Sequence, residues 1–166
     1  MSEQFGPWIS EYAYSLLARR DYAVKELRAK VELAASRHFG ELSSPQVDEL
    51  DSLLTLLQER RHLSEERFVL SWIENRITVK PRGRFMILQE LLAHGVDRDL
   101  AERLLRSELL PALEQSMAAR LAAKKMRSQA DTRKITSYLA AKGFSYECIR
   151  RVLAAAGTKD DTPEDI

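Results

Sequence analysis

Residues 87–97 read Ile-Leu-Gln-Glu-Leu-Leu-Ala-His-Gly-Val-Asp, and this stretch decides the fold class of the chain. Its isoleucine and leucines recur at the spacing of one helical face, and Gly95 stands where that helix must end. Asp97 then offers a side-chain oxygen that can cap the next helix, with Val96 before it as half of a hydrophobic staple. The stretch therefore predicts two helices joined by a tight turn.

The same pattern returns farther along the chain, where residues 135–145 read Ile-Thr-Ser-Tyr-Leu-Ala-Ala-Lys-Gly-Phe-Ser. Under the shift that carries Ile87 onto Ile135, the glycine, the capping residue and the apolar positions all coincide. Residues 25–30 match the same place a third time, with Leu27 over Leu91. An internal repeat of this kind indicates a chain built from similar helical units.

Each unit is predicted to hold three helices, because the middle repeat carries three apolar stripes at helical spacing. The fold class is therefore all-α, an elongated tandem array of three three-helix units with about nine helices. Units this short are marginal alone, so neighbouring units are expected to bury one another's flanks. The predicted units are residues 1–60, 61–109 and 110–157, followed by an acidic disordered tail at 158–166.

Composition narrows the classes of function. The chain has 166 residues, 31% of them charged, yet its formal net charge is only +1, which suits extensive solvated helical surface. A single cysteine rules out an internal disulfide and a cysteine-rich zinc site. Neither a signal peptide nor an apolar run of membrane-spanning length is visible. We therefore expect a cytoplasmic monomer that does not contact membranes.

No pattern in the chain predicts catalysis. Cys148 falls on Leu100 in the repeat, so we expect it to be a small buried core residue rather than a nucleophile. Three scattered histidines form no metal-ligand cluster, and no glycine-rich phosphate loop appears. The sequence thus predicts a binding protein with no catalytic residue, no cofactor and no metal.

Basic residues gather near the first helix junction of each unit, which is the one charge pattern that exceeds an ordinary solvated surface. Stacked units would align these groups as a ridge for phosphates or for an acidic protein groove. We expect them to act through charge rather than packing, so that charge reversal leaves the fold intact. The predicted binding residues are Arg19, Arg20, Lys25, Arg28, Arg76, Lys80, Arg82, Arg84, Lys124 and Lys134.

Three segments together resemble one known family. Residues 16–30 are similar to the opening module of RecX proteins, and residues 87–97 to the middle module with its Ile-x-Gln-Glu-Leu-x-x-Lys-Gly-Ile pattern. Residues 143–153 are similar to the closing segment. The order and spacing of the three matches are typical of the family. Where the family commonly has a Lys-Gly-Tyr-Gly-like turn, this chain has residues 79–83, Val-Lys-Pro-Arg-Gly.

The resemblance implies a regulator that lies in the groove of a RecA–DNA filament and modulates, by inhibition, the ATPase, strand-exchange and coprotease activities of RecA. It implies a role in homologous recombination, DNA repair and the SOS response, with no enzyme activity or cofactor. Two other interpretations stay open. One is direct DNA binding by helix-turn-helix-like units, including backbone contacts to single- or double-stranded DNA, although the third helices begin with acidic residues. The other is a helical adaptor for a different partner.

Overall fold

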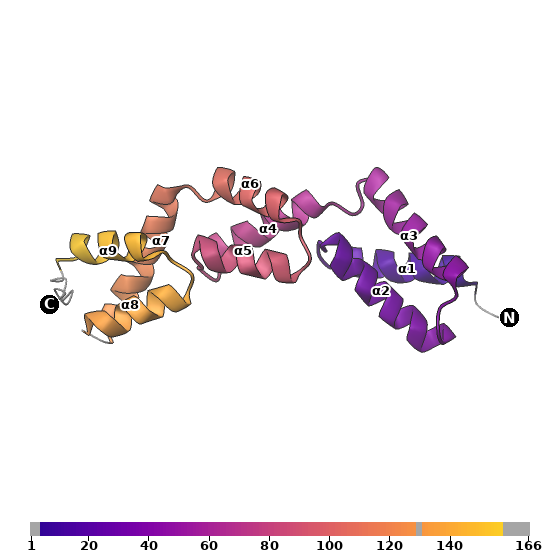
Figure 1. Ribbon diagram of the computed structural model, residues 1–166, viewed down its shortest axis with the longest axis horizontal. Coiled ribbons are helices and arrows are strands. Elements are labelled where there is room, and N and C mark those ends of the chain that lie inside the picture. The colour runs from indigo at the N-terminus through magenta and orange to yellow at the C-terminus, as the bar shows by residue number, and fades with distance from the viewer. Residues whose placement is uncertain (1–3, 129–130, 158–166) are drawn as a thin grey trace, which may run out of the picture. The chain divides into compact units, whose positions relative to one another are not determined.

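The structure, a computed structural model, describes residues 4–128 and 131–157, and within these ranges all regular elements are helices (Figure 1). This confirms the all-α prediction. The predicted tail at 158–166 lies outside the described residues. The helices are α1 (Phe5–Leu17), α2 (Val24–Phe39), α3 (Ser44–Glu59), α4 (Glu65–Thr78), α5 (Arg84–Ala93), α6 (Arg98–Glu108), α7 (Pro111–Met126), α8 (Thr132–Ala141) and α9 (Tyr146–Ala155).

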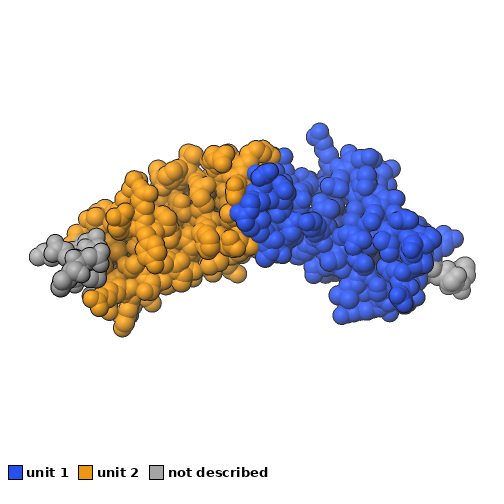
Figure 2. Space-filling view, viewed as in Figure 1, with its two compact units in different colours: residues 1–71, 91–100 blue, residues 72–90, 101–166 orange. Residues whose placement is uncertain are grey.

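The chain packs as two compact units (Figure 2). Unit 1 contains residues 1–71 and 91–100, and unit 2 contains residues 72–90 and 101–166. Helices α4, α5 and α6 each contribute residues to both units. The finer division into three separate three-helix units stays a prediction.

In unit 1, helices α1, α2 and α3 pack against one another in all three pairings. Each helix turns one apolar stripe inward, as the helical spacing of its leucines and alanines requires. Ala13 and Ala35 are fully buried, and such small side chains let neighbouring backbones approach closely. The core of this unit consists of Ile9, Ala13, Leu16, Tyr22, Leu27, Val31, Ala35, Leu50, Leu53, Leu54, Leu57 and Leu63.

In unit 2, helices α7, α8 and α9 form a second set of mutually packed helices. The α7 stripe is made of Met117, Ala118 and Ala122, all of them buried. Helix α8 buries Ile135 and Leu139. Helix α9 completes the core with Ile149, Val152 and Leu153.

The predicted caps and turns are confirmed by their hydrogen bonds. The side chains of the predicted caps Asp97 and Ser145 each accept a hydrogen bond from the backbone amide three residues later, both at 3.1 Å, and Ser64 caps α4 in the same way at 3.2 Å. Gly95 and Gly143 adopt left-handed backbone conformations with φ of 81° and 92°. These local rules therefore fix where α4, α6 and α9 begin.

The structure confirms one alignment of the repeat and corrects the other. The predicted shift that carries Ile87 onto Ile135 is here called the α5-to-α8 shift. Under this shift the first and the last residues of α5 fall on the first and the last residues of α8. The alignment of Leu27 with Leu91 is wrong by about one helical turn. Helices α2 and α5 begin at Val24 and Arg84, and superposing these starts, here called the α2-to-α5 shift, places Leu27 over Ile87. Leu27 and Ile87 are both fully buried. Shifting an alignment by one helical turn leaves the apolar residues on the same buried face of the helix. The apolar pattern alone therefore could not distinguish the alignment of Leu27 with Leu91 from its alignment with Ile87.

Candidate binding surface

Two of the predicted basic residues, both in unit 1, are neutralised by acidic neighbours. Arg20 lies 2.6 Å from a carboxylate oxygen of Glu26, and this hydrogen bond raises the pKa of Arg20. Arg28 contacts Glu32 at 2.6 Å and Asp51 at 2.9 Å, and the bond to Asp51 is the main cause of its raised pKa. Both guanidinium groups therefore bring little uncompensated charge to the surface.

Arg19 and Lys25 are two further predicted cations of unit 1, and both are exposed. Neither forms an ion pair with another residue in the described part of the chain. The aliphatic part of Lys25 lies against Gly95, so closely that a Cβ on that glycine would come within 2.9 Å of the lysine Cδ. Lys25 thus packs through its methylenes, as long cationic side chains commonly do.

Arg76, in unit 2, is chiefly a packing residue. Its Nε lies 2.6 Å from a carboxylate oxygen of Glu90, and its guanidinium lies 4.4 Å from the ring centroid of Trp72. The Trp72 indole N–H donates to the same Glu90 oxygen at 2.8 Å, and the Arg76 side chain is only 14% exposed. For Arg76 we therefore expect charge reversal to disturb the fold, since two partly buried carboxylates would then face each other.

Arg82 adds positive charge beside the same carboxylate, and Lys142 adds a further positive charge beside Arg82. The Arg82 Nε lies 4.0 Å from Glu90, which already holds Arg76. The pKa of Lys142 is lowered, first by partial burial of its ammonium group and then by the positive charge of Arg82. The resulting group, here called the Glu90 cluster, consists of Arg76, Arg82, Glu90 and Lys142, so that three cations accompany one carboxylate.

Sequence reasoning missed Lys142, although the repeat carries a signal for it. Under the α5-to-α8 shift Lys142 corresponds to His94, which in unit 1 lies 3.3 Å from a Glu26 oxygen. Under the α2-to-α5 shift the counterpart of Glu26 is Met86, which has no charge. Unit 2 therefore has a lysine where unit 1 has His94, and a methionine where unit 1 has Glu26.

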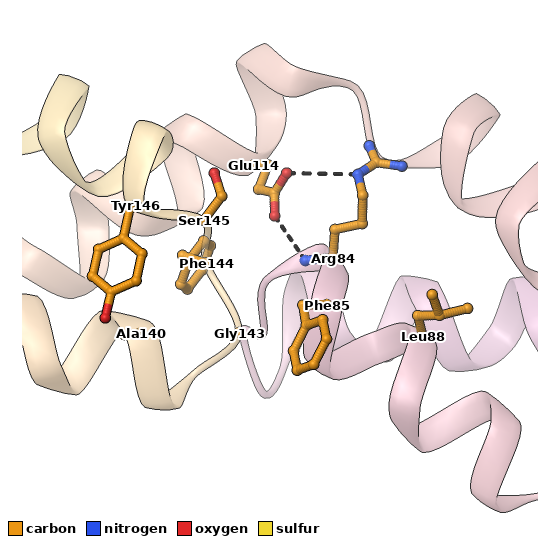
Figure 3. Close-up of a pocket in the computed structure, with 9 residues that line it drawn as sticks. All are labelled: Arg84, Phe85, Leu88, Glu114, Ala140, Gly143, Phe144, Ser145 and Tyr146. Carbon is orange, nitrogen blue, oxygen red and sulfur yellow. Dashed lines mark hydrogen bonds and ion pairs between the residues drawn. The ribbon is translucent and has the colours of Figure 1, made fainter.

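Arg84 is held in place by Glu114. The Arg84 backbone N–H donates to one Glu114 oxygen at 2.7 Å, and the Arg84 Nε lies 3.8 Å from the other (Figure 3). Its guanidinium also donates to the Leu109 carbonyl. The backbone part of this contact recurs in unit 1, where the N–H of Val24 donates to Glu65 at 3.1 Å. Arg84 is therefore a structural partner of α7 rather than an uncompensated surface charge.

Lys80, Lys124 and Lys134 are exposed and form no ion pair within the described ranges. Lys134 and its neighbour Arg133 lie in the first turn of α8, which contains no acidic residue. Positive charge there opposes the helix dipole, so these two residues do not serve the stability of α8. Their placement leaves them available for an anionic partner.

Cys148 is half-buried, as is Leu100, its counterpart in the repeat. The expectation of a fully buried core cysteine is therefore corrected to a partly covered one. Burial raises the pKa of the Cys148 thiol, and the charge of Glu114 raises it further. Both effects disfavour the reactive thiolate.

No group of three or more histidine, cysteine, aspartate or glutamate side chains in residues 4–128 and 131–157 could hold a metal ion. Among the described helices, none combines the length and the apolar character that crossing a bilayer demands.

The comparison with known proteins identifies the family. The family model for the second three-helix domain of RecX matches residues 64–105, and the model for the third three-helix domain matches residues 113–153. The chain is 32% identical to the regulatory protein RecX of Chromohalobacter salexigens over 87% of this chain and 90% of that protein. The chain belongs to the RecX family. A second RecX regulatory protein, from Herbaspirillum seropedicae, is 32% identical over 70% of this chain and 75% of its own length.

Solved RecX structures share the fold. The crystal structure of RecX from Lactobacillus salivarius superposes with a TM-score of 0.78 at 20% identity, covering 92% of this chain and 97% of that one. A second RecX crystal structure gives a TM-score of 0.75 at 16% identity, over 90% of this chain and 73% of the other. In this RecX-family chain the Glu90 cluster draws on both matched domains, with Lys142 from the third and the other three residues from the second.

Proposed function

We propose that this RecX-family protein binds RecA–DNA filaments and modulates RecA, inhibiting its ATPase, strand-exchange and coprotease activities. It acts as a cytoplasmic monomer that binds without catalysis and without a cofactor. Family membership supports a regulatory role, because the curated relatives are named regulatory protein RecX. The observation that carries the proposal is the excess of cations over acids in the Glu90 cluster.

An anionic partner would complete the charge balance of this cluster. Lys142 is partly desolvated beside Arg82, whereas at the equivalent position of unit 1 the His94 Nδ1 lies 3.3 Å from a carboxylate oxygen of Glu26. A phosphate or a carboxylate of the filament placed at the same position would relieve the repulsion between the two cations. Such charge-assisted contacts are stronger than neutral hydrogen bonds and weaken as salt rises.

The exposed lysines extend this surface beyond the cluster. Lys80 follows the end of α4, Lys124 lies in the last turn of α7 and Lys134 in the first turn of α8. Arg19 and Lys25 provide the corresponding exposed charge of unit 1. We expect these residues to contribute through charge, whereas Arg20, Arg28, Arg76 and Arg84 contribute mainly to the fold.

The test is the ATPase activity of RecA on single-stranded DNA, measured with increasing amounts of this protein over a series of salt concentrations. The variant Lys80→Glu with Lys142→Glu removes two cations that have no ion-pair partner in the described part of the chain. A matched control is Arg120→Glu with Arg150→Glu, which changes the net charge equally at two exposed positions elsewhere in unit 2. We expect the first variant to inhibit less and the control to inhibit as wild type.

Equal inhibition by all three proteins at every salt concentration would contradict the assignment of the Glu90 cluster as the binding surface. Loss of RecA inhibition in the control as well would mean that only the net charge matters. Circular dichroism must show equal helicity in all variants before the comparison is made.

A further inference from the structure

Unit 2 contains an open pocket of about 550 Å³ beside the Glu90 cluster, and two of its lining residues expose aromatic rings. Phe85 is 64% exposed and Tyr146 is 71% exposed, whereas Phe144, which also lines the pocket, is 4% exposed. In the view of Figure 3 the ring of Phe144 lies between those of Tyr146 and Phe85. The pocket is thus lined by one buried ring, that of Phe144, and by two solvent-exposed rings, those of Phe85 and Tyr146.

The fold itself does not require these exposed rings. In unit 1 the start of α2 corresponds to the start of α5 in unit 2. Gly95 there has a left-handed backbone, as Gly143 has in unit 2. The Val24 amide donates to a glutamate, as the Arg84 amide does in unit 2. The equivalent positions of unit 1 are charged: Phe85, Leu88 and Tyr146 correspond to Lys25, Arg28 and Arg98. Since leaving large apolar rings in water is unfavourable, a role in binding explains them better than folding does.

The charges around the pocket specify its ligand further. Within the pocket, Glu114 is neutralised by Arg84, so the lining carries no net charge. Lys142 directly precedes the lining residue Gly143, and Arg82 is separated from the lining residue Arg84 by Gly83 alone. The Gly83 N–H donates to the Lys142 carbonyl at 2.8 Å. Two exposed aromatic rings in a lining without net charge therefore lie beside two cations, Arg82 and Lys142, whose positive charge is not fully balanced by carboxylates.

We propose that this pocket binds unpaired bases of single-stranded nucleic acid, which stack on Phe85 and Tyr146 while adjoining phosphates contact Arg82 and Lys142. Aromatic platforms beside cations are the usual means of holding single strands without sequence preference. Bases in a duplex are already stacked on one another and offer only their edges to a protein. An apolar segment of a protein would use the rings but would gain nothing from the cations. The proposal does not depend on RecA, because the strand is bound directly.

The first experiment compares two strands of equal charge. Binding of a fluorescent oligo(dT) is measured by anisotropy against an abasic phosphodeoxyribose strand of the same length, without RecA. The wild-type protein should bind oligo(dT) about 5-fold more tightly or better, because stacking adds to the phosphate contacts only when bases are present. Equal affinity for the two strands would overturn the proposal.

The second experiment exchanges the pocket residues for those of unit 1. The variant Phe85→Lys with Tyr146→Arg adds two positive charges and removes both exposed rings. If binding were purely electrostatic, this variant would bind oligo(dT) more tightly than wild type. We expect it to bind about 5-fold to 100-fold more weakly, and to lose the preference over the abasic strand.

Two further variants show whether the weaker binding of the Lys/Arg variant comes from lost stacking or from a disturbed fold. Phe85→Tyr with Tyr146→Phe keeps both rings and should retain affinity for oligo(dT). Phe85→Leu with Tyr146→Leu keeps apolar side chains, adds no charge and should lose the preference for bases. If the leucine variant still binds oligo(dT) as wild type, stacking is excluded. If the Lys/Arg variant keeps oligo(dT) binding and loses only its affinity for RecA protein, the pocket binds an apolar protein segment and the proposal fails.

Discussion

Gly83 and Gly143 lie in direct backbone contact, so that the turn before α5 and the turn before α9 are joined without side chains. The Gly83 N–H donates to the Lys142 carbonyl at 2.8 Å, and the Phe85 N–H donates to the Gly143 carbonyl at 3.3 Å. A Cβ on Gly83 would overlap the carbonyl group of Gly143 and the amide nitrogen of Phe144. This contact sets the positions of both Arg82 and Lys142, and so it builds the Glu90 cluster.

Substituting Gly143 should therefore cost more than its left-handed backbone alone explains. In Gly143→Ala the residue must keep φ near 92°, which costs about 1–2 kcal/mol, and its Cβ must also displace Met86, which adds about 1–3 kcal/mol. The free energy of unfolding, measured by urea titration with circular dichroism, gives the total.

Gly40→Ala provides the matched control for this measurement. Gly40 has φ of 87°, close to that of Gly143, but no atom lies within 4 Å of an added Cβ. Because Gly40 combines this φ with ψ of −162°, a conformation adopted essentially by glycine alone, we expect the alanine there to cost about 1–3 kcal/mol through the backbone and nothing through steric overlap. Equal losses for the two variants would show that the Gly143 turn has room for a side chain.

Arg76 and Lys80 should differ sharply in their effect on stability, although they stand close together in the chain. Arg76→Ala leaves Glu90 without its closest cation in a partly buried place, so unfolding should become easier by about 2 kcal/mol. Lys80→Ala should change the free energy of unfolding by no more than about 0.5 kcal/mol, because Lys80 is exposed. Similar losses in the two variants, measured by urea unfolding, would contradict the packing role of Arg76.

Local signals in the sequence were sufficient for the helices, their caps and the repeat that relates α5 to α8, because each depends on patterns formed by residues close together in the chain. They were not sufficient for the binding surface. Whether an arginine is free depends on acids that come near only after folding, as Glu90 does for Arg76. Lys142 was missed for the same reason, since its neighbour Arg82 is distant in sequence. The register of Leu27 also needed the structure, because one helical turn leaves the apolar stripe unchanged.

Cys148 should react slowly with thiol reagents in the folded protein, and more slowly than in the unfolded chain. Partial burial raises the pKa of its thiol, so the thiolate fraction near neutral pH is smaller than in solution. This group therefore stabilises the fold below its ordinary pKa, and that contribution is lost as pH rises through the raised pKa. The rate of modification, followed from pH 7 to 10 with and without urea, should keep rising in the folded protein after that of the unfolded chain has levelled. Coincident profiles would contradict the burial of Cys148.

The titration of Lys142 reports directly on the Glu90 cluster. Its pKa is lowered in the folded protein, so the charged form is disfavoured there and the associated stability is lost as pH falls through the lowered pKa. Arg82→Gln removes the repelling charge, and the pKa of Lys142 should rise toward its ordinary value without reaching it, because burial is the larger cause.

The measurement is an NMR titration of the Lys142 ε-carbon in the wild type and in Arg82→Gln, with Lys80→Gln as the control. Lys80 is not among the causes of the lowered pKa, so its removal should leave the Lys142 titration unchanged. Adding inorganic phosphate to the wild type should also raise the pKa of Lys142 if an anion settles between the two cations. An identical pKa in the wild type and in Arg82→Gln would show that Arg82 and Lys142 do not interact, and Lys142 would then not belong to the Glu90 cluster.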